Sequence, residues 1–241
     1  MTILAPGETP SAPLPRLRAA LSRIAADRAT NDRALAGVGA IIGIAAFAWL
    51  LHRLIGAGHG PLLIAPVGAA AVLVFAVPAS PLAQPWALFG GNILSALVGV
   101  TVARLGLDPW WAAGLAVGGA ICAMALLRCL HPPGGAVALT AVLGGPAVAA
   151  SGYGFVAMPV AVGTAMLFLT AWCYHRFSGH SYPHVAPAAP VVVHSPLEFG
   201  REDLLGAIDD YPDILDVNID DLERLLHAAE QRALNRRRGT R

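Results

Sequence analysis

The chain has 241 residues, of which 56% are hydrophobic and only 13% are charged, about half the charged fraction of soluble domains. Its formal net charge of +1 gives no reason to expect a nucleic-acid partner. Between residues 34 and 174 the only strong acids and bases are Arg53, Arg104, Asp108 and Arg128. This composition excludes an ordinary soluble domain and predicts an integral membrane protein embedded in a lipid bilayer.

Arginines mark the ends of the expected membrane domain. Five of them lie between residues 16 and 33, and Arg176 follows the last apolar run, so the positive-inside rule places both termini in the cytoplasm. The leader lacks the cleavage site of a signal peptide, and a bacterial inner membrane is the simplest location. The expected parts are an Arg-rich leader (1–33), a transmembrane domain (34–176), a Pro/Ala linker (177–198) and a charged, helical cytoplasmic tail (199–241).

Four apolar runs of about 18 residues are long enough to span a bilayer. All five tryptophans lie at an end of one of these runs, where the membrane interface favours indole rings. The runs are Ala34–Leu51, Trp86–Ala103, Trp110–Leu127 and Phe155–Trp172.

Two shorter apolar pieces, Pro66–Pro78 and Pro132–Pro146, are broken by proline and glycine. They share the pattern Pro-x-Gly-[Ala/Gly]-Ala-x-x-Leu, and each begins with proline, which suits the first turn of a helix. The order of long run, short broken run and long run then occurs twice, as in transporters built from inverted repeats with discontinuous helices. We expect an all-α polytopic membrane bundle with two broken half-helices in an inverted repeat. Either four spans with two re-entrant pieces or six spans with two short ones satisfy the pattern. The alternative to a repeat is that the two short pieces match by chance, because small residues and proline are common in membrane helices.

The starts of the two half-helices suggest an anion site. A helix N-terminus carries unpaired N–H groups and the positive end of the dipole, which together favour an anion. Half-helices that begin at Pro66 and at Pro132 or Pro133, and meet near the midplane, would converge on one small site. Gly68 and Gly134 would let a ligand reach the backbone. The alternative is that these glycines only allow close helix packing.

Three polar side chains lie close to these breaks. A cation as deep as Arg128 costs about 2.5 kcal/mol or more at a helix centre, so it either extends to the surface or faces a bound anion. His131 can donate a hydrogen bond, titrate near neutral pH or bond a backbone carbonyl at the break. Asn92 lies early in a span and can line the same cavity. The predicted substrate-binding residues are Pro66, Gly68, Ala69, Asn92, Arg128, His131, Pro132, Pro133, Gly134 and Gly135.

Several other kinds of function lack the residues they need. Proton-coupled cation carriers normally use intramembrane carboxylates, and the only acid of the membrane region, Asp108, lies at an interface. No nucleophile motif or metal-binding spacing occurs, so we expect no catalytic residue, no metal and no cofactor. Cys122, Cys129 and Cys173 are typical of small core residues rather than of a disulfide framework.

The segments "PVGAAAVLVFAVPASPLAQPWALFGGN" and "HPPGGAVAL" closely resemble the HPP family of integral membrane proteins, whose His-Pro-Pro motif is His131-Pro132-Pro133 here. The resemblance covers roughly residues 32 to 182. Plant and cyanobacterial members are regarded as nitrite transporters, so the resemblance implies a small-anion transporter. Members often carry Phe-Gly-Ala-Ser where this chain has Val67-Gly68-Ala69-Ala70, and the missing hydroxyl at Ala70 matters if it touches the substrate.

The leading hypothesis is a transporter or channel for a small inorganic anion, nitrite first. The alternative is a non-transporting membrane scaffold or sensor that acts through its cytoplasmic helical tail. Gly39-x-x-x-Gly43, Gly114-x-x-x-Gly118 and the apolar stripe of the tail helix suggest a homo-oligomer.

Overall fold

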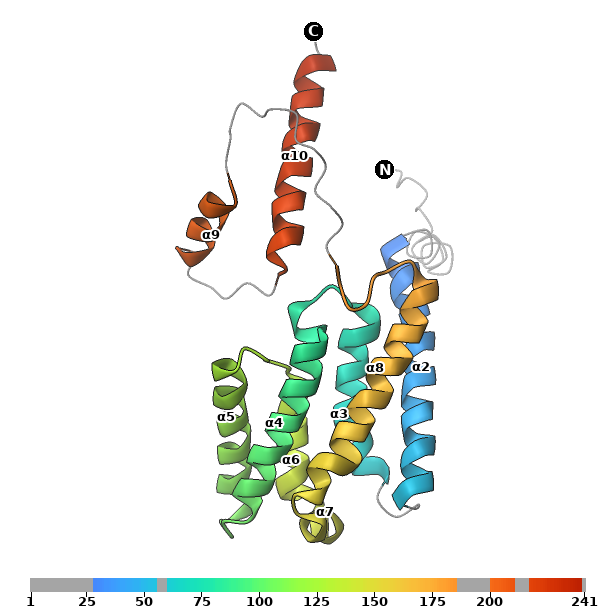
Figure 1. The fold of residues 1–241 in the computed structure, drawn as a ribbon, viewed down its shortest axis with the longest axis vertical. Helices are drawn as coiled ribbons and strands as arrows, with labels where there is room; N and C mark the ends of the chain where they lie inside the picture. The colour runs from blue at the N-terminus through green and yellow to red at the C-terminus, as the bar shows by residue number, and fades with distance from the viewer. Residues whose placement is uncertain (1–27, 56–59, 186–199, 211–216, 240–241) are drawn as a thin grey trace, which may run out of the picture.

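The computed structural model describes the backbone of residues 28–55, 60–185, 200–210 and 217–239, and these ranges form helices and turns with no strand (Figure 1). The element labels are those of Figure 1. An all-α bundle is therefore confirmed for the described part of the chain.

Four long apolar helices form the frame of the bundle, and each has the length and hydropathy of a membrane span, the fourth only together with the stretch before it, as Val156–Ser178. They correspond to the four predicted runs, with ends that differ by a few residues. The last is preceded by a π-helical stretch, η4 (Val156–Ala161). The four helices are α2 (Arg28–Ile55), α4 (Pro85–Ala103), α5 (Pro109–Leu126) and α8 (Val162–Ser178).

Two shorter segments run between them. One is α3 (Gly60–Ala71), which continues into the π-helical η2 (Val72–Ala76). The other is α6 (Pro133–Leu143), which turns by 96° into α7 (Gly145–Ser151). The α6 segment begins and ends where the second broken half-helix was predicted. The first prediction is wrong in its start, because α3 begins at Gly60 and Pro66 lies inside it.

The chain reverses direction at each step along the bundle (Figure 1). We call the end where α2 begins and α8 finishes the termini end, and the opposite end the far end. The elements α2, α3 and α4 run away from, toward and away from the termini end, whereas α5, α6 and α8 run in the opposite sense. These directions agree with an inverted repeat but also with any six alternating segments, so the repeat stays a prediction, as does the choice between re-entrant pieces and short spans for α3 and α6.

The closest helix packing joins α4 to α6 through small residues. A Cβ added at Gly99 of α4 would lie 2.7 Å from the Ala138 carbonyl oxygen of α6. A Cβ at Gly134 would lie 2.5 Å from the Ser95 hydroxyl oxygen. Helices in lipid gain stability mainly from such close backbone approach, since lipid tails are as apolar as leucine. This contact fixes α6 deep inside the bundle.

The Gly-x-x-x-Gly pairs of α2 and α5 differ in their surroundings. Gly39 and Gly43 pack against the Phe75 ring of η2, as expected for a packing motif. Cβ atoms added at Gly114 and Gly118 of α5 would meet no atom within 4 Å. The α5 pair therefore faces outward from the chain.

Beyond α8 the tail contains α9 (Arg201–Asp209) and α10 (Ile219–Gly239), as the charge and leucine pattern predicted. Arg201 joins them, because its Nη1 lies 2.6 Å from Asp220 Oδ1 and 2.9 Å from Glu223 Oε2. The first residues of the expected linker do not form a free connection: α8 runs to Ser178, and Tyr182 is only 6% exposed. The rest of the linker lies outside the described residues, as does the predicted leader up to residue 27.

The α4–α6 contact predicts unequal effects for two glycine substitutions. Gly99→Ala forces a methyl group into the backbone of α6 and should lower the free energy of unfolding by about 1–3 kcal/mol. Gly118→Ala adds its methyl group to open space and should be neutral or slightly stabilising, because alanine is the better helix former. Thermal unfolding of both variants in the same detergent micelle measures the difference. Equal melting temperatures would contradict the packing described here.

Candidate functional site

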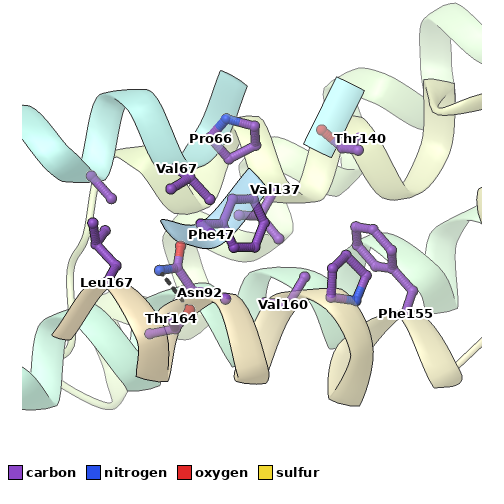
Figure 2. A pocket seen from close by; sticks show the side chains of 13 residues that line it. Phe47, Pro66, Val67, Asn92, Val137, Thr140, Phe155, Val160, Thr164 and Leu167 are labelled. Atoms are coloured by element: carbon purple, nitrogen blue, oxygen red, sulfur yellow. Dashed lines mark hydrogen bonds between the residues drawn. The ribbon is translucent and has the colours of Figure 1, made fainter. Parts of the chain in front are cut away.

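A small cavity lies in the middle of the bundle, between α2, α3, α4, α6 and the η4–α8 segment (Figure 2). Its volume is about 30 Å³, two to three times the minimum of about 10–15 Å³ that admits one water molecule. A small ion fits this space, whereas a bulky organic substrate does not. The lining residues are Phe47, Pro66, Val67, Ala70, Asn92, Val137, Thr140, Phe155, Pro159, Val160, Gly163, Thr164 and Leu167.

The polar side of the cavity is built from an amide and two hydroxyl groups. Asn92 Nδ2 of α4 donates to Thr164 Oγ1 of α8 at 3.3 Å, and each of these residues is only 5% exposed (Figure 2). Thr140 of α6 donates to the Ala136 carbonyl oxygen at 2.7 Å. Buried polar groups of this kind are costly unless they are hydrogen-bonded, so their position in a membrane core points to a functional role.

Two helix interruptions border the same cavity. Pro66 lies inside α3, and because it has no N–H group it cannot bond the carbonyl group one turn earlier. On the opposite wall, Met158 has non-helical backbone angles (φ −133°, ψ 117°) directly before Pro159. Broken backbone inside a membrane persists only where protein or a polar cavity surrounds it. Both breaks are therefore consistent with a solute pathway through this part of the bundle.

Two hydrophobic clusters border the cavity, one toward each end of the bundle. The termini-side cluster contains Val74, Leu88 and Leu167, among others, and the far-side cluster contains Phe47, Val100 and Phe155, among others. Leu167 and Ala70 belong to the first cluster and also line the cavity, while Phe47, Val137 and Phe155 do the same for the second. The cavity thus lies between two apolar clusters.

The structure brings only two of the predicted site residues to the cavity, Pro66 and Asn92. Ala69 is exposed, and a Cβ added at Gly68 would meet no atom within 4 Å. Arg128 is exposed and adopts a left-handed backbone conformation (φ 51°) in the turn between α5 and α6. Of the two alternatives for Arg128, exposure near the membrane surface agrees with the structure.

The His-Pro-Pro-Gly-Gly segment packs at the termini end of α4 rather than around the cavity. His131 is fully buried, and its Nδ1–H donates to the Leu82 carbonyl oxygen at 2.9 Å. Its Cβ lies directly against Gly91, where a side chain would collide with it. His131 Nε2 is buried without a partner in the described part of the chain. The prediction that His131 bonds a backbone carbonyl is therefore confirmed, but the carbonyl belongs to the distant Leu82 and not to the helix break itself.

The rest of the motif builds the start of α6. Pro133 and Gly134 are buried, Gly135 is partly buried near Val117, and Pro132 is exposed. The Gly134 and Gly135 N–H groups donate to the His131 and Pro132 carbonyl oxygens at 2.8 and 3.0 Å. Two of the N–H groups expected to hold an anion are therefore already used within the turn.

The predicted meeting of two positive helix ends is wrong. The α3 helix begins at Gly60 at the far end, whereas α6 begins at Pro133 toward the termini end (Figure 1). The two segments run antiparallel, and it is their middles, near Val67 and Val137, that meet at the cavity. Helix dipoles therefore do not converge on the site.

Sequence reasoning missed most of the cavity wall. Thr164, Gly163, Phe47 and Phe155 carry no motif, and a lone threonine such as Thr140 gives no signal because it can satisfy its own helix. The interruption of the last span by Pro159 was the signal most able to direct attention there. Within the described ranges no three His, Cys, Asp or Glu side chains gather to hold a metal ion.

The comparisons with known proteins agree with this architecture. A model of the HPP transmembrane region matches residues 26–183 of the chain. A transmembrane protein of Dictyostelium discoideum is 41% identical over 127 residues, which are 50% of this chain and 44% of that protein. A second one from the same organism is 37% identical over 141 residues, or 57% and 45% of the two chains.

The chain thus aligns with less than half the length of these curated relatives, and no solved structure matches it. The family match covers well over half of the chain and contains all the membrane helices described above. The chain belongs to the HPP family of transmembrane proteins.

Proposed function

We propose that the chain is a membrane transporter or channel for a small inorganic anion, with nitrite as the first candidate. The observation that carries the proposal is the small cavity inside the bundle, whose polar wall consists of uncharged hydrogen-bonding groups, the Asn92 amide and the Thr140 and Thr164 hydroxyls. The resemblance to nitrite-transporting HPP proteins points to the same class of solute.

The donors of the cavity suit a solute with two acceptor oxygens. The Asn92 amide has two N–H donors, and Thr164 accepts one of them. The Thr164 hydroxyl then retains its own O–H donor. Each hydrogen bond to a charged group contributes about 1.5–3 kcal/mol. Two such donors can hold the two oxygens of nitrite at neighbouring positions.

The cavity offers no negative charge to a cation. No acid or base is among the described cavity residues, and the membrane helices carry no carboxylate near it. The N–H groups of Asn92 and the O–H group of Thr164 are donors that an anion can use. Weak binding without a fixed opposite charge also lets the solute leave, which transport requires.

The membrane placement of the protein forms part of the proposal. Arginines at residues 28 and 33 begin α2 and Arg176 ends α8, so the termini end faces the cytoplasm by the positive-inside rule. We place the chain in a bacterial inner membrane. The outward-facing Gly114 and Gly118 on α5 suit contact with a second copy, so a homo-oligomer is the expected form.

Nitrite uptake into proteoliposomes that contain a nitrite-sensitive probe is the primary test. Vesicles with the purified chain should take up nitrite at a clearly higher initial rate than protein-free vesicles. Equal rates for nitrite, nitrate and other small anions in both kinds of vesicle would refute the proposal.

Loss of one donor should slow transport. Thr164→Val keeps the shape of the side chain but removes the hydroxyl, so nitrite uptake should fall about 10–100-fold, the equivalent of one hydrogen bond to a charged group. Thr170→Val is the matched control in the same helix, because Thr170 bonds only its own helix at the Met166 and Leu167 carbonyl oxygens. A similar loss in both variants would show that the cavity hydroxyl has no special role.

Reshaping the cavity should also block transport. A Cβ added at Gly163 would collide with the Phe47 ring, and because both residues line the cavity, its shape must change. We expect Gly163→Ala to reduce nitrite uptake at least about tenfold, given the low compressibility of packed interiors. Gly68→Ala, whose methyl group meets no neighbour, should leave uptake unchanged. Wild-type rates for Gly163→Ala would place the pathway elsewhere.

Truncation separates transport from the scaffold alternative. A chain that ends before residue 199 retains the complete cavity, so nitrite uptake should persist. A scaffold or sensor that acts through α9 and α10 would instead lose its cellular function on truncation and keep it in Thr164→Val. Comparing the growth or nitrite phenotype of the two variants in the same host distinguishes the readings.

A further inference from the structure

The loop between η2 and α4, residues 77–84, is fastened at the termini end by groups from two other parts of the chain. His131 Nδ1–H donates to the Leu82 carbonyl oxygen at 2.9 Å, from the turn before α6. The Tyr182 hydroxyl donates to the Ala83 carbonyl oxygen at 2.8 Å, and the His184 N–H donates to Gln84 Oε1 at 2.9 Å. We call residues 77–84 the termini-end loop.

The loop is also braced from within. Gln84 Nε2 donates to the carbonyl oxygens of Pro78 and Ser80, at 2.9 Å in both cases. Burial raises the pKa of the Tyr182 hydroxyl, which keeps its proton and remains a donor to the loop. The loop therefore behaves as one stiff unit attached to the segment that follows α8.

This loop connects two walls of the cavity. On one side η2 continues α3, which contributes Pro66, Val67 and Ala70, and on the other α4 contributes Asn92. Opening the termini-side cluster requires η2 or α4 to move away from α8, because the cluster contains Val74 of η2, Leu88 of α4 and Leu167 of α8. Such a movement stretches the bonds from Tyr182 and His184 to the loop.

His184 also carries the connection into the tail. Its backbone N–H holds Gln84, while its ring Nε2–H donates to Asp221 Oδ2 of α10 at 2.8 Å. The His184 and Asp221 side chains are only 12% and 31% exposed, so water competes weakly for this bond. Arg224, one turn further along α10, contacts the same carboxylate and fixes its position.

The start of α10 is well ordered around this contact. Asn218 Oδ1 accepts the N–H groups of Asp220 and Asp221 at 2.9 and 3.3 Å, as a helix cap does. Asp220, the neighbouring acid, faces Arg201 of α9 instead of His184. Two adjacent carboxylates in one helical turn thus have separate partners, one in the tail and one at the membrane domain.

We propose that α10 is an intramolecular latch: through Asp221 it holds His184, and through His184 it holds the termini-end loop against the opening of the cavity. The occupant of this docking surface is the chain's own tail. The latch rests on the proposed transport function for its consequence, but the attachment of α10 to the loop can be measured without transport. Release of the tail increases the fraction of chains that are open at the termini end.

A thiol placed in the termini-side cluster reports this opening directly. Val74 of η2 is 0% exposed and belongs to that cluster, so separation of η2 or α4 from α8 exposes position 74. In a Cys122→Ser, Cys129→Ala, Cys173→Ser background the thiol introduced by Val74→Cys is the sole one, so its rate of labelling by N-ethylmaleimide measures the open fraction.

The deciding comparison is Asp221→Ala against Asp220→Ala in the full chain. Both substitutions remove one negative charge from the first turn of α10 and so affect the helix dipole equally. Asp221→Ala should increase both the labelling rate of the thiol introduced at position 74 and the initial rate of nitrite uptake about threefold, the size expected for one partly exposed polar contact. Asp220→Ala should change neither rate.

A second pair of variants keeps the test independent of α10 stability. His184→Gln retains a side-chain N–H donor for Asp221 and should label at nearly the wild-type rate, whereas His184→Ala should label as fast as Asp221→Ala. Equal labelling in all variants would overturn the latch. Absence of nitrite uptake in every variant, with labelling that still follows the pattern above, would overturn the proposed function and leave the attachment of α10 established.

Discussion

Backbone groups that lose their helical partners cannot face hydrocarbon, and this constraint organises the membrane domain. Pro66 removes a donor from α3, and the Met158–Pro159 break interrupts the last span. Each unpaired group costs several kcal/mol in lipid, so both breaks must turn toward the interior of the bundle. Both breaks border the cavity that Asn92 and Thr164 also line, and these two side chains bond each other. The polar groups of the membrane core therefore lie around this one cavity.

The close approach of α4 and α6 makes this arrangement possible. Gly99 lies against the α6 backbone and Gly134 against the α4 backbone, so α6 can run through the centre of the bundle although it is short. The His-Pro-Pro segment then positions the start of α6: His131 binds the loop before α4, and Gly91 leaves room for its side chain. The motif that gives the family its name is thus, in this chain, a fastening between two cavity-lining helices. For the proposed transport, this motif therefore matters through its position rather than through contact with the solute.

Much of the fold follows from local pattern, and much of the site does not. The four long spans could be predicted from the sequence because run length, tryptophan position and charge agree. The start of α6 could be predicted because two prolines and two glycines follow a polar stretch. The predicted helix start at Pro66 was wrong. A proline in the first turn and a proline inside a membrane helix cannot be told apart when the preceding residues, "GPLLIA", are also apolar. The partners of Asn92 and His131 lie 72 and 49 residues away, and no periodicity encodes which helix faces which at that range.

The failure of the helix-dipole hypothesis changes the expected physics of transport. Two positive helix ends aimed at one point would hold an anion strongly, since their field acts in a medium of low dielectric constant. Here the starts of α3 and α6 lie at opposite ends, and the cavity offers directional hydrogen bonds without net charge. For the proposed transport, the hydrogen bonds from Asn92 and Thr164 are then the main replacement for the water that the anion has lost. The transport rate depends both on these bonds and on how often the two hydrophobic clusters separate. Control of the protein belongs accordingly at the ends of the bundle, and the termini end is where His131, Tyr182 and the tail-linked His184 converge on a single loop.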